Sequence, residues 1–119
     1  MTRTKFLALG AMALLVAAAM AAASPARAAD IEVKIDNFTF NPQQITVNAG
    51  DTVIWVNHDD IPHTVTSKTM AFRSKAMDTD DKFSFTFATP GSYAYFCSLH
   101  PHMTGTIVVE GATGSDTSP

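Results

Sequence analysis

The stretch Cys97-Ser98-Leu99-His100-Pro101-His102-Met103 contains the only cysteine of the chain. Three of its side chains, at every third position, offer a thiolate, an imidazole and a thioether, all of which bind transition metals. This spacing allows one tight loop to bring the three donors to a single ion. A separate Pro62-His63 pair, well upstream, supplies a fourth donor. The sequence therefore predicts a metal site built from one loop and one distant segment.

The donor set favours copper, with His63, Cys97, His100 and Met103 as the four ligands. A thiolate and two neutral imidazoles in a trigonal plane, with a weak axial thioether, suit both Cu(I) and Cu(II), so little rearranges when one electron moves. A single cysteine or methionine is more often an apolar core residue, so the prediction depends on the joint pattern. Zinc accepts the same donors and stays open as an alternative metal.

Each expected ligand has its own role. Cys97 is expected to be the most buried ligand, because it follows a strand directly. His63 is expected to bond through its second ring nitrogen to a backbone carbonyl or a water. His100 is expected at the surface, where its outer edge is the port for electrons, and Met103 is the weak axial ligand.

Short runs of alternating apolar and polar residues fill the rest of the chain, separated by Gly, Pro and Asn turns, as is typical of β-strands. Phe38 and Phe40 are expected to continue the in-out pattern of the first strand, and Trp55 is expected in the core. The segment 67–82 has no clean period, and no long amphipathic helix is predicted. The pattern indicates an all-β, Greek-key β-sandwich of about seven to eight strands. The expected strands are 31–40, 45–47, 52–57, 83–87, 92–96 and 105–110.

The first residues read as a secretory signal peptide. A basic start is followed by the apolar run 6–23 and by the cleavage motif Ala26-Arg27-Ala28. A membrane anchor is the alternative, but Arg27 and the small residues beside it favour removal. We therefore expect a leader over 1–28, a domain over 29–110, a disordered tail over 111–119, and a periplasmic protein with no membrane anchor after cleavage.

Length, charge and cysteine content limit the function. Cleavage leaves 91 residues, enough for one domain. It removes three of the eight basic residues and none of the eleven acidic ones, so the formal charge becomes −6. Nucleic acid is therefore not expected as a partner. Exported cysteines usually pair as disulfides, so a single one needs another role, which metal ligation supplies.

These features resemble the cupredoxins, and within them the amicyanin-like branch near plastocyanin and pseudoazurin. The resemblance implies a small periplasmic, monomeric electron carrier that holds one copper ion. It also implies a redox donor and acceptor, such as an amine dehydrogenase (methylamine dehydrogenase for amicyanin) and a c-type cytochrome. The matching segments are Asn41-Pro42, 47–57, Pro62-His63-Thr64-Val65, Pro90-Gly91-Ser92-Tyr93, and 95–103 with Gly105.

Three positions depart from that pattern. Leu99 stands where amicyanin has proline, and its N–H is expected to bond to the sulfur of Cys97. His102 stands where amicyanin has phenylalanine, and is either a solvated residue or a rim group that changes charge near neutral pH. Thr64 stands where many cupredoxins have asparagine, which leaves open a backbone or hydroxyl bond to the Cys97 region.

The sequence gives two alternatives for each feature of the partner-binding surface. Met70 and Met77, with Leu99 and Pro101, are candidates for an apolar collar around His100, with core packing as the alternative for both methionines. The acidic run 78–81 is either a solvated face or a steering patch for a basic partner.

Electron transfer is the leading predicted function, and copper buffering or delivery is the alternative. The chain has no Met-rich or His-rich tract of the kind that would favour delivery. An enzyme is not expected, because four closed ligands leave no open metal position for a substrate.

Overall fold

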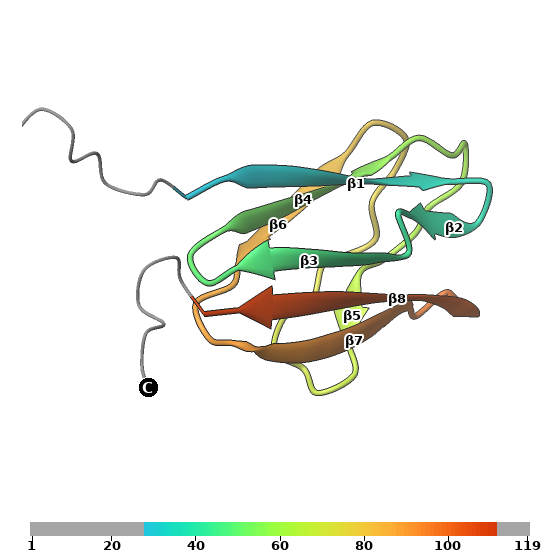
Figure 1. The fold of residues 1–119 in the computed structure, drawn as a ribbon. Helices are drawn as coiled ribbons and strands as arrows, with labels where there is room; N and C mark the ends of the chain where they lie inside the picture. The colour runs from blue at the N-terminus through green and yellow to red at the C-terminus, as the bar shows by residue number, and fades with distance from the viewer. Residues whose placement is uncertain (1–27, 112–119) are drawn as a thin grey trace, which may run out of the picture.

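Two four-stranded β-sheets form the computed structural model, which describes residues 28–111 (Figure 1). One sheet has the order β2-β1-β4-β6 and the other β3-β8-β7-β5. The predicted all-β sandwich of seven to eight strands is confirmed. The expected leader and tail lie outside the described residues, apart from Ala28 and Gly111. The strands are β1 (Asp30–Asp36), β2 (Thr39–Asn41), β3 (Gln44–Asn48), β4 (Thr52–Asn57), β5 (Thr66–Ser67), β6 (Lys82–Thr86), β7 (Gly91–Cys97) and β8 (His100–Glu110).

The core lies between the sheets and is rich in aromatic side chains. Alternation along each strand sends every second residue inward, so β1 buries Val33 and Ile35 and exposes their neighbours. Trp55 on β4 is fully buried, as predicted, and its ring packs at right angles to that of Tyr95 on β7, with centroids 5.4 Å apart. Tyr95 lies two residues before Cys97 on β7 and faces the same side, so this aromatic layer packs directly beside the cysteine.

Two strand pairs are parallel and join distant parts of the chain. β1 pairs with β4, and β3 pairs with β8, whereas β7 and β8 are antiparallel neighbours. β8 therefore lies between β3 and β7 in its sheet. β3 pairs only with residues 106–110 of β8, so His100, at the start of β8, is held by its pairing with Cys97 of β7.

The first predicted strand is in fact a hairpin. Asp36 pairs with Thr39, and the chain reverses at Asn37 and Phe38, which have φ angles of 53° and 59°. The prediction that Phe38 continues the in-out pattern is therefore wrong. Phe38 sits at the tip of the turn and is half exposed, whereas Phe40 on β2 is buried as expected.

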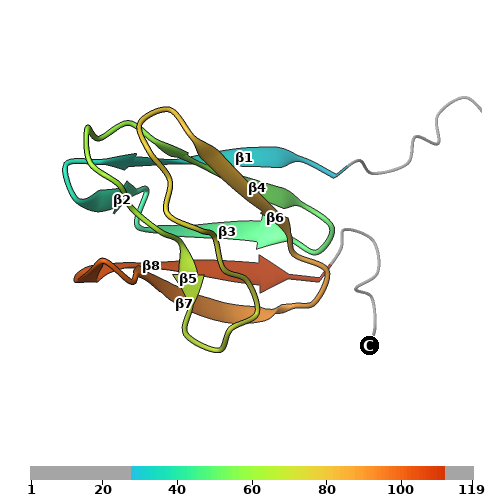
Figure 2. The ribbon, with the colours of Figure 1, turned by 180° about the vertical axis from the view of Figure 1, so that it is seen from behind.

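The segment without a clean period forms an irregular ribbon beside β5 (Figure 2). Isolated bridges pair His63 with Met77 and Thr66 with Arg73, so residues 63–66 run beside 73–77. No helix in the described part of the chain is long and apolar enough to cross a membrane.

Candidate metal centre

The predicted ligand loop is a short hairpin. β7 ends at Cys97, β8 begins at His100, and these two residues pair across the strands with Ser98 and Leu99 at the tip. β8 was expected to start only at Gly105, so the strand extends further and includes the ligand segment. A register irregularity between Phe96 and Cys97 marks where the hairpin leaves regular pairing. Both donors are therefore held by one rigid element.

His63 comes from the segment between β4 and β5. Its backbone N–H donates to the carbonyl of Met77 over 3.2 Å, and the N–H of Met77 donates back over 2.8 Å. The imidazole has no exposed surface. This segment leaves β4 at the same end of the sandwich as the β7–β8 hairpin, so the ring centroids of His63 and His100 lie 4.9 Å apart.

The three polar donors converge. The ligand atoms of His63, Cys97 and His100 all lie within 4.8 Å of one another. Nδ1 of His63 is 3.8 Å from Sγ of Cys97, and Nδ1 of His100 is 3.6 Å from it. With metal–sulfur and metal–nitrogen bonds of about 2.3 and 2.0 Å, a trigonal angle of about 120° places the two donor atoms about 3.7 Å apart. The donors thus fit one metal ion in a trigonal plane.

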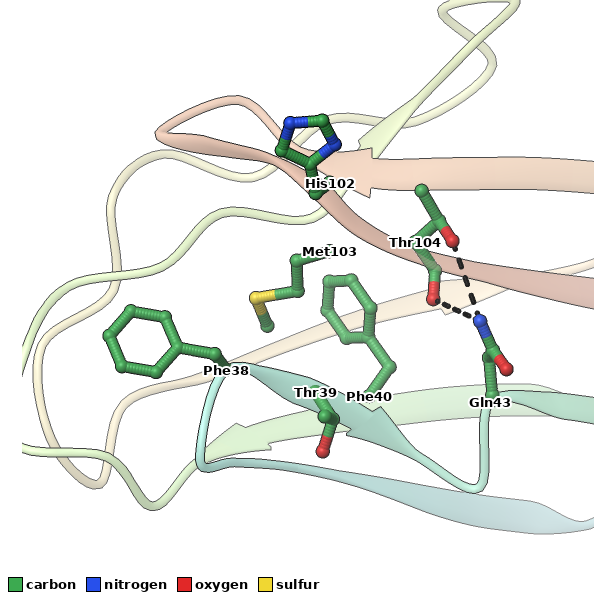
Figure 3. Close-up of a pocket in the computed structure, with 7 residues that line it drawn as sticks. All are labelled: Phe38, Thr39, Phe40, Gln43, His102, Met103 and Thr104. Carbon is green, nitrogen blue, oxygen red and sulfur yellow. Dashed lines mark hydrogen bonds between the residues drawn. The ribbon is translucent and has the colours of Figure 1, made fainter.

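Met103 lies beneath the same hairpin and is buried in the hydrophobic core together with Cys97. Figure 3 shows its thioether reaching from β8 toward β2, between the rings of Phe38 and Phe40. His102 is exposed on the opposite side of the strand, because neighbouring residues of a strand point to opposite faces (Figure 3).

Exposure differs among the expected ligands. Cys97 and His63 are both at 0% exposure, so Cys97 is not more buried than His63. Met103 is also buried, and His100 alone is partly exposed. The only edge of the donor set that meets solvent is therefore that of His100, where the sequence placed the electron port.

Thr64 ties the two ligand segments together. Its N–H donates to Sγ of Cys97 over 3.3 Å, and its hydroxyl accepts the N–H of Ser98 over 2.7 Å. The sequence left open whether the backbone or the hydroxyl of Thr64 bonds to the Cys97 region, and in the structure both groups do. The expected bond from Leu99 N–H is absent from residues 28–111, where Thr64 supplies the backbone donor to the sulfur instead.

The second ring nitrogen of His63 meets a carboxylate, not the predicted backbone carbonyl or water. Nε2–H donates to Oδ2 of Asp59 over 2.7 Å, which leaves Nδ1 free for a metal. Burial opposes ionisation of Asp59, but N–H donors of Phe38 and Asn37, and then His63, hold the pKa of this carboxyl below its usual value of 3.8. The sequence alone did not point to this residue, because a separation of four positions outside a helix fixes no geometry.

The apolar surface differs from the predicted collar. Met77 is buried in the core. Met70 is exposed, but it lies away from the hairpin. Its loop is held beside the middle of β7, where the N–H of Lys68 donates to the carbonyl of Ala94. Phe38, which the sequence did not suggest, contacts the rings of both histidines. The exposed apolar residues near His100 are therefore Phe38, Leu99 and Pro101.

Comparison with known proteins agrees with this site. The cupredoxin-like domain family matches residues 6–109. Amicyanin from Paracoccus versutus is 38% identical over 96 residues, covering 72% of this chain and 73% of that protein. Amicyanin-alpha from Methylorubrum extorquens is 35% identical over 108 residues, covering 87% and 91%. Plastocyanin from Scenedesmus fuscus is 32% identical over 98 residues, covering 68% and 100%.

Solved structures agree as well. A purple cupredoxin from Nitrosopumilus maritimus superposes with a TM-score of 0.65 at 29% identity, covering 68% of this chain and 100% of the other. A Cu(I) amicyanin variant gives 0.65 at 31% identity, covering 68% and 82%. The chain therefore belongs to the cupredoxin-like family. Within that family it is a type 1 copper protein and electron carrier, similar to the amicyanins and plastocyanins.

Proposed function

We propose that this cupredoxin is a periplasmic one-electron carrier whose single copper ion is held by His63, Cys97, His100 and Met103. The observation that supports the ligand assignment most strongly is the placement of two imidazole Nδ1 atoms 3.8 and 3.6 Å from one buried thiol sulfur. Copper bound there supplies a Cu(I)/Cu(II) couple. The protein holds the donors in nearly fixed positions, because both ligand segments are bonded to neighbouring backbone.

Partner docking is proposed at the His100 end. His100 is the one partly exposed donor, and Phe38, Leu99 and Pro101 surround it with apolar surface. A small apolar area suits the brief contacts of redox proteins. We propose a redox protein donor and acceptor, with an amine dehydrogenase and a c-type cytochrome as candidates, and a monomeric carrier between them. No catalysis by the carrier itself is part of the proposal.

The acidic run 78–81 supports steering of a basic partner. Asp80 N–H donates to the carbonyl of Asn57, and the hydroxyl of Thr79 donates to the carbonyl of Asp59. These bonds fix the acidic run beside the segment that leads to His63. Opposite charges accelerate encounter, and salt weakens the effect. Replacing Asp78 and Asp81 by asparagine should slow electron exchange with a basic cytochrome and flatten its salt dependence, whereas Glu110→Gln, at the other end of β8, should change neither.

Export completes the proposal. Residues 1–28 serve as a cleaved leader, 29–110 form the copper domain, and 111–119 form a tail. Periplasmic location suits a protein with a single cysteine engaged by metal. Cell fractionation followed by N-terminal sequencing tests this part independently of the metal.

The experiment that tests the proposed site is the visible and electron paramagnetic resonance spectrum of the mature protein with Cu(II). An intense thiolate-to-copper band with small hyperfine splitting, bleached by ascorbate and restored on oxidation, is expected. Cys97→Ser should abolish the band, whereas Ser98→Ala, at the neighbouring position, should keep it. A colourless wild-type protein would overturn the ligand assignment and bring zinc or copper handling forward.

A further inference from the structure

Phe38 occupies an unusual position for a large apolar side chain. It is 50% exposed at the tip of the β1–β2 turn, where φ is 59°. Left-handed backbone is a clear outlier for a bulky residue and is usually left to Gly, Asn or Asp. Asn37 suits such a turn, but phenylalanine does not. A conformation of this kind persists only where surrounding contacts hold it.

Asp59 provides those contacts. Its Oδ1 accepts the N–H of Asn37 over 2.6 Å, and its Oδ2 accepts the N–H of Phe38 over 3.0 Å. The same Oδ2 accepts Nε2–H of His63 over 2.7 Å. One carboxylate therefore joins the turn to an expected ligand.

The turn places the phenyl ring against both histidines. Its centroid is 5.4 Å from that of His63 and 5.1 Å from that of His100, at interplanar angles of 87° and 89°. Edge-to-face pairs of this geometry are favourable. Phe38 also lines, with Phe40 and Met103, a crevice between β2 and the first residues of β8 (Figure 3).

We propose that Phe38 is a positioning residue of the metal centre: held by Asp59, its ring fixes the orientation of His100 and shields the donor set from small anions in solvent. The inference rests on the proposed copper site and deepens it. His100 is the only expected ligand that is not buried, so its ring is the one whose orientation the core does not fix and a surface side chain must restrain. Without the phenyl ring, the His100 imidazole is free to tilt and the donor set loses its shield from solvent.

The test uses the Phe38→Gly variant, because glycine accepts a positive φ and so removes the ring without straining the turn. Azide is titrated into the Cu(II) protein and followed by its visible spectrum. We expect azide to bind at least tenfold more tightly to the variant than to the wild type. Phe38→Tyr, which keeps the ring, should restore the wild-type value. Met70→Ala is the control and should bind azide as the wild type does, because Met70 is a similarly exposed apolar residue, at 59%, that lies away from the β7–β8 hairpin.

A second readout needs no copper. In the apoprotein, nuclear Overhauser contacts are expected between the Phe38 ring and the ring protons of both His63 and His100. Their absence, or an azide affinity of Phe38→Gly equal to that of wild type, would overturn the inference. If wild-type protein forms no blue site at all, the proposed function fails instead, and the apoprotein contacts still report on Phe38.

The role of Asp59 is tested in a double-variant cycle. Asp59→Ala should raise azide affinity in the wild-type background, because it releases the turn. In the Phe38→Gly background it should add nothing to the azide affinity. An effect of equal size in both backgrounds would show that Asp59 acts through His63 alone and would overturn the link to Phe38.

Discussion

The backbone N–H of Thr64 donates a hydrogen bond to the sulfur of Cys97 across 3.3 Å. This contact joins the residue after one expected ligand to another expected ligand from a different part of the chain. The Thr64 hydroxyl strengthens the junction, because it also accepts the N–H of Ser98 over 2.7 Å. The two ligand segments are thus bonded to each other without any metal, which predicts a preformed site in the apoprotein.

The first prediction concerns that hydroxyl. Thr64→Val keeps the side-chain shape but leaves the N–H of Ser98 without its acceptor on buried Thr64. Ser98 is exposed at the hairpin tip, so its N–H can turn to water, and the apoprotein should lose about 0.5–1.5 kcal/mol of unfolding free energy, the net value of one hydrogen bond. The hydroxyl also lies 3.9 Å from the sulfur, so its loss should lower the reduction potential of the copper protein. Urea denaturation and voltammetry measure the two effects. Thr46→Val, at an exposed position of β3, is the control. Equal unfolding free energies and equal potentials for the two variants would contradict the prediction.

A second prediction follows from the lowered pKa of Asp59. In the folded apoprotein this carboxyl has a pKa below 3.8, whereas in the unfolded chain it returns to that value. The ionised carboxylate therefore contributes stability above pH 3.8, and this contribution is lost as pH falls through the folded pKa. Asp59→Asn lacks the contribution, so its stability deficit relative to wild type should shrink as the medium is acidified below pH 3.8. Urea titrations of the apoproteins at several pH values measure this. Asp60→Asn, at the exposed neighbouring position, should show no comparable convergence; a constant deficit for Asp59→Asn would refute the assignment.

Gly105 gives the third prediction. A Cβ built on this residue would lie 2.5 Å from Cζ and Oη of the buried Tyr95 ring, too close for any real contact. Gly105→Ala should therefore destabilise the protein by about 1–3 kcal/mol or more, as overpacked cores do. Gly111→Ala is the matched control, because nothing lies within 4 Å of its Cβ. Thermal unfolding of both variants gives the comparison. Equal melting temperatures would mean that Tyr95 is free to move.

Tyr95 itself gives the fourth prediction. Burial raises the pKa of its phenol to about 12, and the nearby indole of Trp55 moderates the rise. Neither Oη of Tyr95 nor Nε1 of Trp55 makes a hydrogen bond of good geometry within residues 28–111. The unfolded chain releases the phenol proton near pH 10.0, and the folded one near 12, so this contribution to stability is lost as pH rises between those values. Tyr95→Phe should remove that part of the alkaline decline. Denaturation between the two pH values tests it, with Tyr93→Phe as the control; a decline unchanged in Tyr95→Phe would contradict it.

The sequence predicted the sandwich because the strand signals are local. Alternation placed Val33 and Ile35 in the core, and short runs between turn residues located most strands. The ligand loop was equally readable, because Cys97, His100 and Met103 differ chemically from ordinary core residues. The structure brings His63 to two of them, as the pattern predicts.

Contacts that depend on several elements were not readable. Asn37-Phe38 contains no glycine, so the alternating pattern ran on through a turn that Asp59 holds from a different segment. The partner of His63 was missed for the same reason, because a four-residue separation outside a helix has no fixed geometry. The early start of β8 at His100 depends on pairing with Cys97, and Pro101 gave no sign of it.

The place of β8 in its sheet has a consequence for how the protein is made. Of the strands within residues 28–111, β8 is synthesised last, yet it is an inner strand between β3 and β7. β3 and β7 therefore have no partner between them until β8 has been made, and the expected ligands His100 and Met103 belong to that same strand. A ribosome that stalls before β8 leaves an open-edged intermediate with His63 and Cys97 but neither of the later two. Met103 precedes by only three residues the stretch 106–110 that pairs with β3, so the donor set and the sheet are completed by the same strand, one directly after the other.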